Sequence, residues 1–170
     1  MGRPARQSVP KGADRDVGEN EVSGLDLSAL YQTPGFMIRI LQIQIFERFF
    51  NYFAAQKISP VEYAILVTVR DNPTMTQSEL AAVLKMKLPN LVNILSKMEA
   101  ARIIRRRRSA RDKRAIELSL TPSGQGKTSQ AAALGDLFNA QTLAALSKHE
   151  QAEFLQMLGR LLEPSKVGPA

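Results

Sequence analysis

Two helix-start signals, followed by a change from helical to strand-like periodicity, constrain the fold of this chain most strongly. Ser59-Pro60-Val61-Glu62 and Thr76-Gln77-Ser78-Glu79 each place a hydroxyl side chain three positions before a glutamate, the capping-box pattern that opens a helix. Pro89 marks a third helix start, because proline is favoured in the first helical turn. After this helix, residues 103–108 and 115–120 are predicted to form two strands joined by a polar, basic turn. Three short helices followed by a hairpin are the order of a winged helix-turn-helix domain.

Longer helices are predicted on both sides of this domain. Thr33-Pro34 opens a helix that extends to about Gln56 and is apolar on more than one face. Thr121-Pro122 opens another, and Ser147-Lys148-His149-Glu150 is a third capping box, which opens a final helix. In a chain of 170 residues, burial of a helix on several sides requires a second subunit, so we expect a homodimer. The predicted fold class is mainly α with a small β-hairpin wing: a winged helix-turn-helix domain plus an α-helical dimerisation region built from the N- and C-terminal helices.

The composition along the chain predicts five segments. Residues 1–24 are rich in Gly, Pro, Arg, Asp and Ser, and we expect a disordered or loosely docked arm there. The other four segments are a dimerisation helix region (25–58), the winged helix-turn-helix DNA-binding domain (59–120), the C-terminal dimerisation helices (121–163) and a flexible tail (164–170).

Basic side chains are concentrated in one segment. The whole chain has a formal net charge of +7, whereas residues 85–114 alone hold eleven basic and two acidic side chains, a net charge of +9. A polyanion is therefore the expected partner, and this segment is its expected binding site. The alternative is an ordinary solvated basic face.

The helix that begins near Pro89 has one apolar and one polar face. Apolar residues between Leu88 and Met98 repeat at the spacing of a helix that packs on a core. On the opposite face, asparagine can pair with adenine and lysine can reach guanine or a phosphate in the major groove of double-stranded DNA. We predict a recognition helix, with a plain solvated face as the alternative. The predicted DNA contacts of this helix, and of the first turn of the helix before it, are Gln77, Ser78, Pro89, Asn90, Asn93, Ser96 and Lys97.

The predicted hairpin is the most basic part of the chain. Because side chains alternate between the two faces of a strand, the four arginines at 105–108 cannot all point one way. We expect some of them to contact phosphates and the tip residues to enter a narrow minor groove. Asp112 is expected to hold a neighbouring arginine, most simply Arg114, in a fixed rotamer. The predicted DNA-binding residues of the hairpin are Arg106, Arg107, Arg108, Arg111, Asp112, Lys113 and Arg114.

The composition excludes several kinds of function. Cysteine is absent and His149 is the single histidine, so disulfides, thiol chemistry and Cys/His metal sites are excluded, and we expect no cofactor or metal. The segment from Gly124 to Thr128 ends like a phosphate-binding loop, but Thr121 stands where that loop needs its first glycine. No other catalytic set stands out, so we do not expect an enzyme. Neither a bilayer-spanning stretch nor a secretion signal is found, and we expect a cytoplasmic protein.

Several short motifs, in order along residues 33–163, resemble the MarR-type winged-helix transcriptional regulators. The sharpest is Asp112-Lys113-Arg114 followed by Leu120-Thr121 and then Gly124, which looks like the family's wing signature D-x-R-x5-L-T-x-x-G. The others, which resemble "L-T-x-x-Q-F-x-x-L", "T-Q-x-E-L-A" and "R-L-E", are Ser59–Leu66, Thr76–Ala81 and Lys97-Met98-Glu99. The resemblance implies an obligate dimer whose two wings straddle a pseudo-palindromic operator. It also implies that Asp112 orients an arginine and that Arg114 contacts DNA.

The chain departs from the family pattern at two positions. Arg102 stands where the family usually has glycine after the recognition helix, so either the arginine accepts a left-handed conformation or the helix ends differently. Pro89 stands where the family often has serine or threonine, and proline has no hydroxyl to make that DNA contact.

The resemblance also implies regulation by a small aromatic carboxylate or phenol that releases a repressor from DNA. Members that sense peroxide or zinc use cysteine or histidine clusters, which this chain lacks. Arg39 is of interest because a cation inside an apolar stretch requires a carboxylate, either from a ligand or from the protein itself. The predicted effector-binding residues are Phe36, Arg39, Ile40, Phe46 and Tyr63.

Two other functions are compatible with the sequence. One is a non-sequence-specific architectural protein that binds DNA or RNA through a basic winged helix. The other is a dimer that serves interactions only and binds no nucleic acid. A large affinity ratio between a chosen site and random DNA, about 10³-fold or more, distinguishes specific binding from the first of these.

Overall fold

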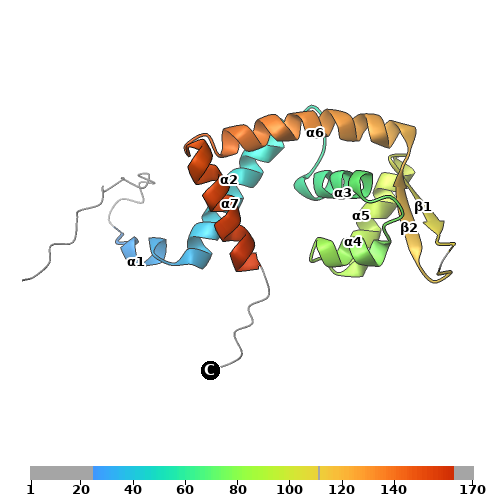
Figure 1. Ribbon diagram of the computed structural model, residues 1–170, viewed down its shortest axis with the longest axis horizontal. Helices are drawn as coiled ribbons and strands as arrows, with labels where there is room; N and C mark the ends of the chain where they lie inside the picture. Colours follow the sequence, from blue (N-terminus) through green and yellow to red (C-terminus); the bar gives the residue numbers. More distant parts are fainter. Residues whose placement is uncertain (1–24, 111, 163–170) are drawn as a thin grey trace, which may run out of the picture. The chain divides into compact units, whose positions relative to one another are not determined.

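The computed structural model describes residues 25–110 and 112–162; the predicted arm (1–24), Arg111 and the predicted tail (164–170) lie outside the described residues. The fold is mainly helical with one two-stranded antiparallel hairpin, which confirms the predicted fold class (Figure 1). The elements are α1 (Ser28–Tyr31), α2 (Pro34–Tyr52), α3 (Pro60–Asp71), α4 (Gln77–Val83), α5 (Leu88–Ala100), β1 (Ile104–Arg108), β2 (Ile116–Leu120), α6 (Pro122–Thr142) and α7 (Lys148–Leu162).

The chain divides into two compact units, one ending at Ile38 and the other beginning at Arg39. In the first unit, the short helix α1 precedes the first turn of α2. The ring of Tyr31 meets that of Phe36 edge to face, with 5.5 Å between the ring centres. All elements from α3 onward belong to the second unit.

Reciprocal hydrogen bonds start the helices of the winged domain, as the capping-box patterns predict. At α3, the Ser59 hydroxyl accepts from the backbone N–H of Glu62 (3.3 Å), and the Glu62 carboxylate accepts from the backbone N–H of Ser59 (2.9 Å). At α4, Thr76 and Glu79 make the same pair of bonds, at 3.2 and 2.7 Å. Such caps contribute about 1 kcal/mol each. They therefore fix where α3 and α4 begin.

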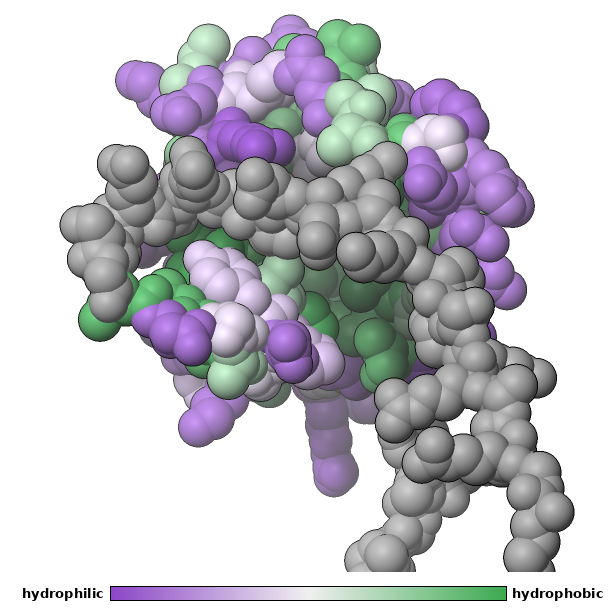
Figure 2. Space-filling model, turned by 90° about the vertical axis from the view of Figure 1, so that its left-hand side faces the viewer, coloured by the Kyte–Doolittle hydropathy of each residue, from purple (hydrophilic) through white to green (hydrophobic). Residues whose placement is uncertain are grey.

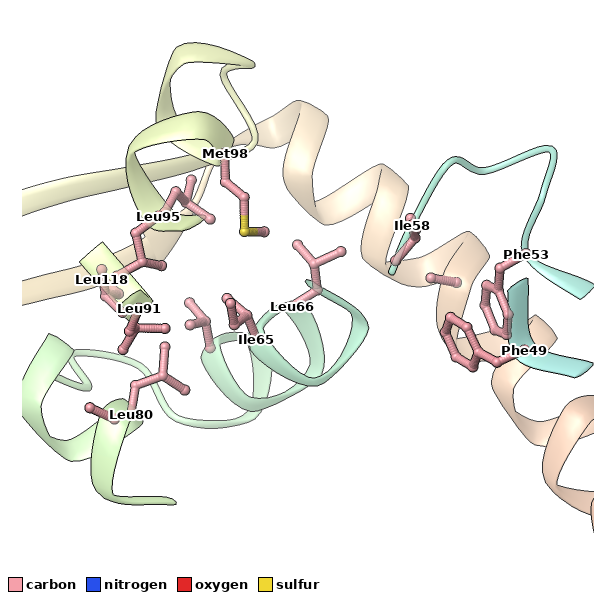
Figure 3. Packing of buried hydrophobic residues seen from close by; sticks show 14 of the residues in the cluster. Phe49, Phe53, Ile58, Ile65, Leu66, Leu80, Leu91, Leu95, Met98 and Leu118 are labelled. Atoms are coloured by element: carbon pink, nitrogen blue, oxygen red, sulfur yellow. The ribbon is translucent and has the colours of Figure 1, made fainter. Parts of the chain in front are cut away.

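The core of the winged domain lies between α3, α4, α5 and the hairpin. Figure 3 shows side chains of α5 pointing toward those of α3, with Leu80 of α4 and Leu118 of β2 beside them. Because only one face of α5 enters this core, its opposite face is left for other contacts. The fully or almost fully buried residues of this cluster are Ile65, Leu66, Leu80, Leu91, Leu95, Met98, Ile104 and Leu118.

An aromatic cluster joins α2, α3 and α6 in the second unit. The rings of Phe49 and Phe53 stack with 4.1 Å between their centres, and Tyr63 and Phe138 meet Phe49 edge to face. A Cβ atom at Gly135 would overlap the Tyr63 hydroxyl, so glycine allows α3 and α6 to approach closely at this point. Burial raises the pKa of the Tyr63 phenol above its ordinary value.

The hairpin is attached to the rest of the winged domain along its second strand. Ile104 pairs with Leu120, and Arg108 pairs with Ile116, at the two ends of the antiparallel register. The backbone N–H of Leu118 donates to the carbonyl of Met75 in the loop between α3 and α4 (2.8 Å). β2 is therefore held from both sides, whereas one edge of β1 stays open among the described elements.

The α5 helix ends in a left-handed turn. Arg102 has a φ of 57°, and the N–H groups of Arg102 and Ile103 donate to the carbonyls of Glu99 and Met98 (both 2.9 Å). These bonds form a Schellman motif, in which glycine is the usual left-handed residue. Of the two possibilities left open by the sequence, the arginine thus accepts the strained conformation.

A clasp built on Thr121 ties the start of α6 to this turn. The Thr121 hydroxyl donates to the carbonyl of Arg102 (2.6 Å), and its backbone N–H donates to the carbonyl of Ile103 (3.0 Å). The same hydroxyl accepts from the backbone N–H of Gly124 (3.0 Å). A Cβ atom at Gly124 would overlap the carbonyl oxygen of Ile103, so this position requires glycine. The Leu-Thr-x-x-Gly pattern of residues 120–124 therefore packs the start of α6 against the base of the hairpin.

Large apolar side chains remain exposed on α2, α6 and α7. Figure 2 shows green hydrophobic surface between purple hydrophilic side chains on the side where α2 and α7 lie in Figure 1. The α7 helix starts at the third predicted capping box, since the backbone N–H of Ser147 donates to the Glu150 carboxylate (2.7 Å). None of the helices in the described ranges is long and apolar enough to cross a membrane. The exposed apolar residues in the second unit on these three helices are Leu41, Ile43, Phe46, Phe50, Leu137, Leu155, Met157, Leu161 and Leu162.

Candidate nucleic-acid interface

The two faces of α5 differ as the sequence predicts, with one exception. Leu91 and Leu95 are fully buried, whereas Asn90, Asn93 and Lys97 are exposed on the other side. Leu88, predicted to pack on the core, is 40% exposed because it is the first residue of the helix and lies outside the core face. The exposed amides and the ammonium follow one another at positions i, i+3 and i+7, so they lie along one line of the helix.

Two predicted contacts on or near this face have other surroundings. The Ser96 hydroxyl donates to the carbonyl of Val92 in its own helix (2.9 Å) and is half-buried. Pro89 is exposed in the first turn of α5 but offers no donor. On α4, Ser78 is exposed and Gln77 is half-buried. Asn90, Asn93 and Lys97 are therefore the freest polar groups of this surface.

Arg106 differs from the other three arginines of β1 because its guanidinium forms an ion pair. Its guanidinium lies 2.6 Å from the Glu99 carboxylate of α5, and the same carboxylate accepts from the backbone N–H of Arg106 (3.1 Å). The Arg106 hydrogen bond holds the pKa of Glu99 below its ordinary value. Only 24% of the Arg106 side chain is exposed. This pair joins α5 to the hairpin, and it directs one arginine of the run inward.

The other three arginines of β1 are exposed. Arg105, Arg107 and Arg108 form no salt bridge among the described residues, although Glu117 is the register partner of Arg107. Four consecutive arginines on a short strand repel one another unless counter-charges are nearby. The exposed guanidinium groups of Arg105, Arg107 and Arg108 therefore form a strongly positive edge that an external anion can neutralise.

Asp112 orders the hairpin turn through backbone contacts. Its carboxylate accepts from the backbone N–H of Arg114 (2.9 Å), and its carbonyl accepts from the N–H of Ala115 (2.9 Å). In the described part of the turn, the contact with Arg114 is to its backbone, not to its guanidinium as expected. A short carboxylate side chain readily bonds the N–H two residues ahead, which explains the difference. Arg111, the other predicted tip residue, lies outside the described residues.

Three predicted contacts share a hollow beside the wing. Ser78, Asp112 and Arg114 line a space of about 880 Å³ between the loop after α3, the start of α4 and the hairpin turn. Lys113 is exposed at the tip. The structure thus brings the start of α4 and the turn of the wing together, although they are more than thirty residues apart in sequence.

The five predicted effector-binding residues differ in burial and in surroundings. Phe36 belongs to the first unit, whereas the other four belong to the second. Arg39 is exposed, Ile40 is half-buried, and Phe46 is 42% exposed. Tyr63 packs in the aromatic cluster with Phe49 and Phe53.

A pocket that the sequence did not indicate lies between α2 and α6. It has a volume of about 480 Å³ and is lined by Arg48, Asn51, Tyr52, Phe138, Gln141 and Thr142. None of the five predicted effector residues lines it. Arg48, like Arg39, is a cation within an apolar helix, and this signal was available in the sequence. The contribution of α6 was not, because it depends on how α2 and α6 pack.

The three short helices, the hairpin and the exposed basic edge define a winged helix-turn-helix protein. A family model described as "MarR family" matches residues 58–116, and this part of the chain is similar to the MarR family of transcriptional regulators. The matched residues run from the start of α3 to the start of β2.

Individual relatives agree with this assignment. The transcriptional regulator HosA of Escherichia coli O127:H6 (strain E2348/69 / EPEC) is 29% identical over 101 residues, which are 59% of this chain and 75% of HosA. The transcriptional repressor CouR, solved with a 23-mer DNA duplex, superposes with a TM-score of 0.78 at 26% identity, covering 82% of this chain and 99% of CouR. CouR bound to p-coumaroyl-CoA superposes with a TM-score of 0.75 at 24% identity, covering 83% and 99%, and this match shows the fold alone.

Proposed function

We propose that this chain is a MarR-family regulator that binds a pseudo-palindromic DNA operator as a homodimer, represses transcription there, and is released by a small aromatic carboxylate or phenol. The observation that carries the proposal is the exposed polar line of α5 beside the exposed arginines of β1. One face of each element builds the core while the other presents groups that recognise bases and phosphates.

The DNA contacts are divided between α5 and the wing. Asn90 and Asn93 are the groups suited to adenine in the major groove, and Lys97 is suited to guanine or a phosphate. Arg107 and Arg108 contact phosphates, while Lys113 and Arg111 enter the adjacent minor groove. Arg106 acts indirectly, since its guanidinium is bound to Glu99. The remaining proposed contacts, at the margins of this surface, are Gln77, Ser78, Pro89, Ser96, Asp112 and Arg114.

The exposed apolar side chains of α2 and α7 support the homodimer. Contiguous exposed apolar surface on a small protein marks an interaction site. A second copy of the chain fits this surface because a two-fold interface places the same patch on both partners. Residues 25–58 and 121–163 are accordingly proposed as the dimerisation parts, with residues 59–120 as the DNA-binding domain.

The proposed effector class is supported by an arginine in an apolar setting and by a relative. Arg39 lies on one side of α2 with Ile43, Phe46 and Phe50, at the spacing i, i+4, i+7 and i+11. A cation that becomes covered by a second subunit needs an anionic partner. CouR, a repressor of similar fold, has been solved with p-coumaroyl-CoA, an aromatic acyl thioester.

Selection of bound sequences from a random DNA pool tests this function. We expect an inverted repeat whose affinity exceeds that of random DNA by about 10³-fold or more at a fixed salt concentration. A flat preference across sequences with a steep salt dependence would instead indicate the architectural alternative. No binding to any duplex at moderate salt would contradict both.

A further inference from the structure

The salt bridge between Glu99 and Arg106 uses both oxygens of one carboxylate. Glu99 Oε2 accepts from Arg106 Nε (2.8 Å) and lies 2.6 Å from a second nitrogen of the same guanidinium. Glu99 Oε1 accepts from the backbone N–H of Arg106 (3.1 Å). Among the described residues, this is the one salt bridge that joins two different elements, since the other two link residues one and four positions apart. Glu99 therefore holds the side chain and the backbone of Arg106 at once.

The pair removes one arginine of β1 from the exposed basic edge. Arg105, Arg107 and Arg108 are exposed and form no salt bridge among the described residues, whereas only 24% of the Arg106 side chain is exposed. The N–H donors of Arg106 that point at Glu99 are not available to a phosphate. If Arg106 moved to a phosphate, it would also leave the Glu99 carboxylate unpaired beside a polyanion, which repels it. The Glu99 contact therefore opposes any such movement.

The other acidic side chains in the described part of the hairpin have different contacts. Glu117 is the register partner of Arg107, yet these two residues form no salt bridge. The Asp112 carboxylate accepts from the backbone N–H of Arg114. Within the described part of the hairpin, an acid thus neutralises Arg106 alone.

The neutralisation of Arg106 matters for discrimination between DNA sequences. A phosphate contact adds the same affinity to every duplex, because phosphates carry no sequence information. One more free arginine would therefore raise the affinity for random DNA, which competes with an operator for the protein. Discrimination depends instead on α5 and the hairpin being held in a fixed arrangement, so that the proposed base and groove contacts form together. An ion pair that neutralises one arginine and also holds β1 against α5 favours the operator in both ways.

We propose that Glu99 is a specificity-determining residue, which withholds Arg106 from the DNA phosphates and fixes β1 relative to α5. Random DNA then meets three free arginines of β1 in place of four, while the operator meets a hairpin in a defined position. Glu99 itself contacts no DNA and is a positioning residue that acts through Arg106. This inference rests on the proposed function and adds to it a residue that limits binding to other DNA.

Replacement of the carboxylate by an amide tests the role of Glu99. Glu99→Gln keeps an oxygen that can accept from the backbone N–H of Arg106, but it loses the charge that holds the guanidinium. Fluorescence anisotropy of the full chain on a random duplex is expected to show an affinity about 3- to 10-fold higher than that of the wild type. The plot of log K against log salt should become steeper by about 0.9 for each guanidinium that reaches a phosphate. A purely structural salt bridge predicts instead a loss of affinity on every duplex and no steeper plot.

The selected operator is expected to respond differently. Its base contacts fix the duplex against α5, so the released Arg106 reaches a phosphate only if the hairpin leaves its position, and the gain and the loss offset each other. We expect the affinity of Glu99→Gln for the operator to stay within about twofold of the wild type, so the ratio of operator to random affinity falls about 3- to 10-fold. An unchanged ratio would overturn the proposal. Because the random duplex needs no operator, a failed operator selection contradicts the proposed function separately.

A control variant separates the release of Arg106 from a simple change in charge. Glu117→Gln removes one negative charge from the same hairpin but breaks no salt bridge. We expect its salt dependence on random DNA to match that of the wild type. A rise in random-DNA affinity equal to that of Glu99→Gln would show that net charge alone is responsible, and it would overturn the proposal.

The double variant Glu99→Gln, Arg106→Gln has the net charge of the wild type and lacks both partners. It is expected to bind random DNA within about twofold of the wild type, because Arg106 contributes no phosphate contact while Glu99 holds it. An affinity that stays as high as in Glu99→Gln would show that Arg106 does not cause the rise. An affinity as low as that of Arg107→Gln would show that Arg106 already contacts phosphates in the wild type. Either result would overturn the proposal.

Discussion

At the scale of single residues, the positions that matter most for the proposed DNA recognition are those whose side chains have no role in the core. Asn90, Asn93 and Lys97 are exposed on α5, although the opposite face of the same helix is fully buried. An amide that projects from a rigidly packed helix is held in a defined place, which is the requirement for recognising one base among four. The exposed arginines of β1, Arg105, Arg107 and Arg108, form no salt bridge among the described residues and suit the less directional phosphate contacts.

Substitution of Asn93 tests this distinction. Asn93→Ala is expected to weaken binding to the selected operator by about 1–3 kcal/mol and to relax the preference at one base position. Arg107→Ala is the matched comparison, because it is expected to weaken operator and random DNA alike and to reduce the salt dependence. Fluorescence anisotropy on both duplexes at several salt concentrations measures these effects. An equal loss on both duplexes for Asn93→Ala would remove Asn93 from base recognition.

Arg102 offers a prediction about stability. Its φ of 57° is costly for a residue with a Cβ atom and natural for glycine. Arg102→Gly is therefore expected to increase the free energy of unfolding by about 0.5–1 kcal/mol. Ala101→Gly, one position earlier with a φ of −75°, should lower it. Urea denaturation compares the two variants, and a destabilised Arg102→Gly would contradict the account of this turn.

At the scale of elements, the angle between the recognition helix and the wing is fixed by the contact of Glu99 with Arg106 and by the Thr121 clasp. The Glu99 carboxylate accepts from both the backbone and the side chain of Arg106, so it fixes the position of β1 as well as of one guanidinium. The clasp closes the same junction from α6. The spacing between the proposed major-groove and minor-groove contacts depends on both.

The Glu99–Arg106 pair has a pH dependence whose sign follows from the pKa of Glu99. Because the folded protein holds this pKa below its ordinary value, the pair stabilises the fold above the ordinary pKa of about 4.5, and the stabilisation is lost as the pH falls through the lowered value. A double-mutant cycle of Glu99→Gln and Arg106→Gln is expected to give a coupling of about 0.5–1 kcal/mol at pH 7. This coupling should vanish in acid. A coupling that is unchanged at a pH well below the lowered pKa of Glu99 would show that the carboxylate charge plays no part.

Features that depend on residues close together in the sequence were predicted correctly, whereas features that depend on the packing of distant elements were not. The capping boxes at Ser59 and Thr76 were predicted and confirmed because their bonds span three residues. The ion pair of Arg106 was not predicted, because it depends on where β1 lies against α5. The backbone bond from Arg114 to Asp112 differs from the expected side-chain contact, since several partners lie within reach of so short a side chain. The Arg48 pocket was missed because its second wall is α6, some ninety residues farther along the chain.

At the scale of the whole molecule, the proposed recognition of an operator requires two copies of the chain. The exposed apolar side chains of α2 and α7 are too many for a protein that acts alone, and one winged domain contacts only one half-site. Two domains held at a fixed separation read two half-sites about 10 base pairs apart, centre to centre. Affinity and operator symmetry therefore both follow from the dimer.

The mass of the complex with the selected operator tests this central claim most directly. Analytical ultracentrifugation of the 18.8 kDa chain at micromolar concentration is expected to show a dimer in the free state and two chains on each duplex. As a control, a duplex with one half-site replaced by random sequence should bind much more weakly. A free monomer at that concentration, or a saturated complex with one chain per intact operator, would contradict the account.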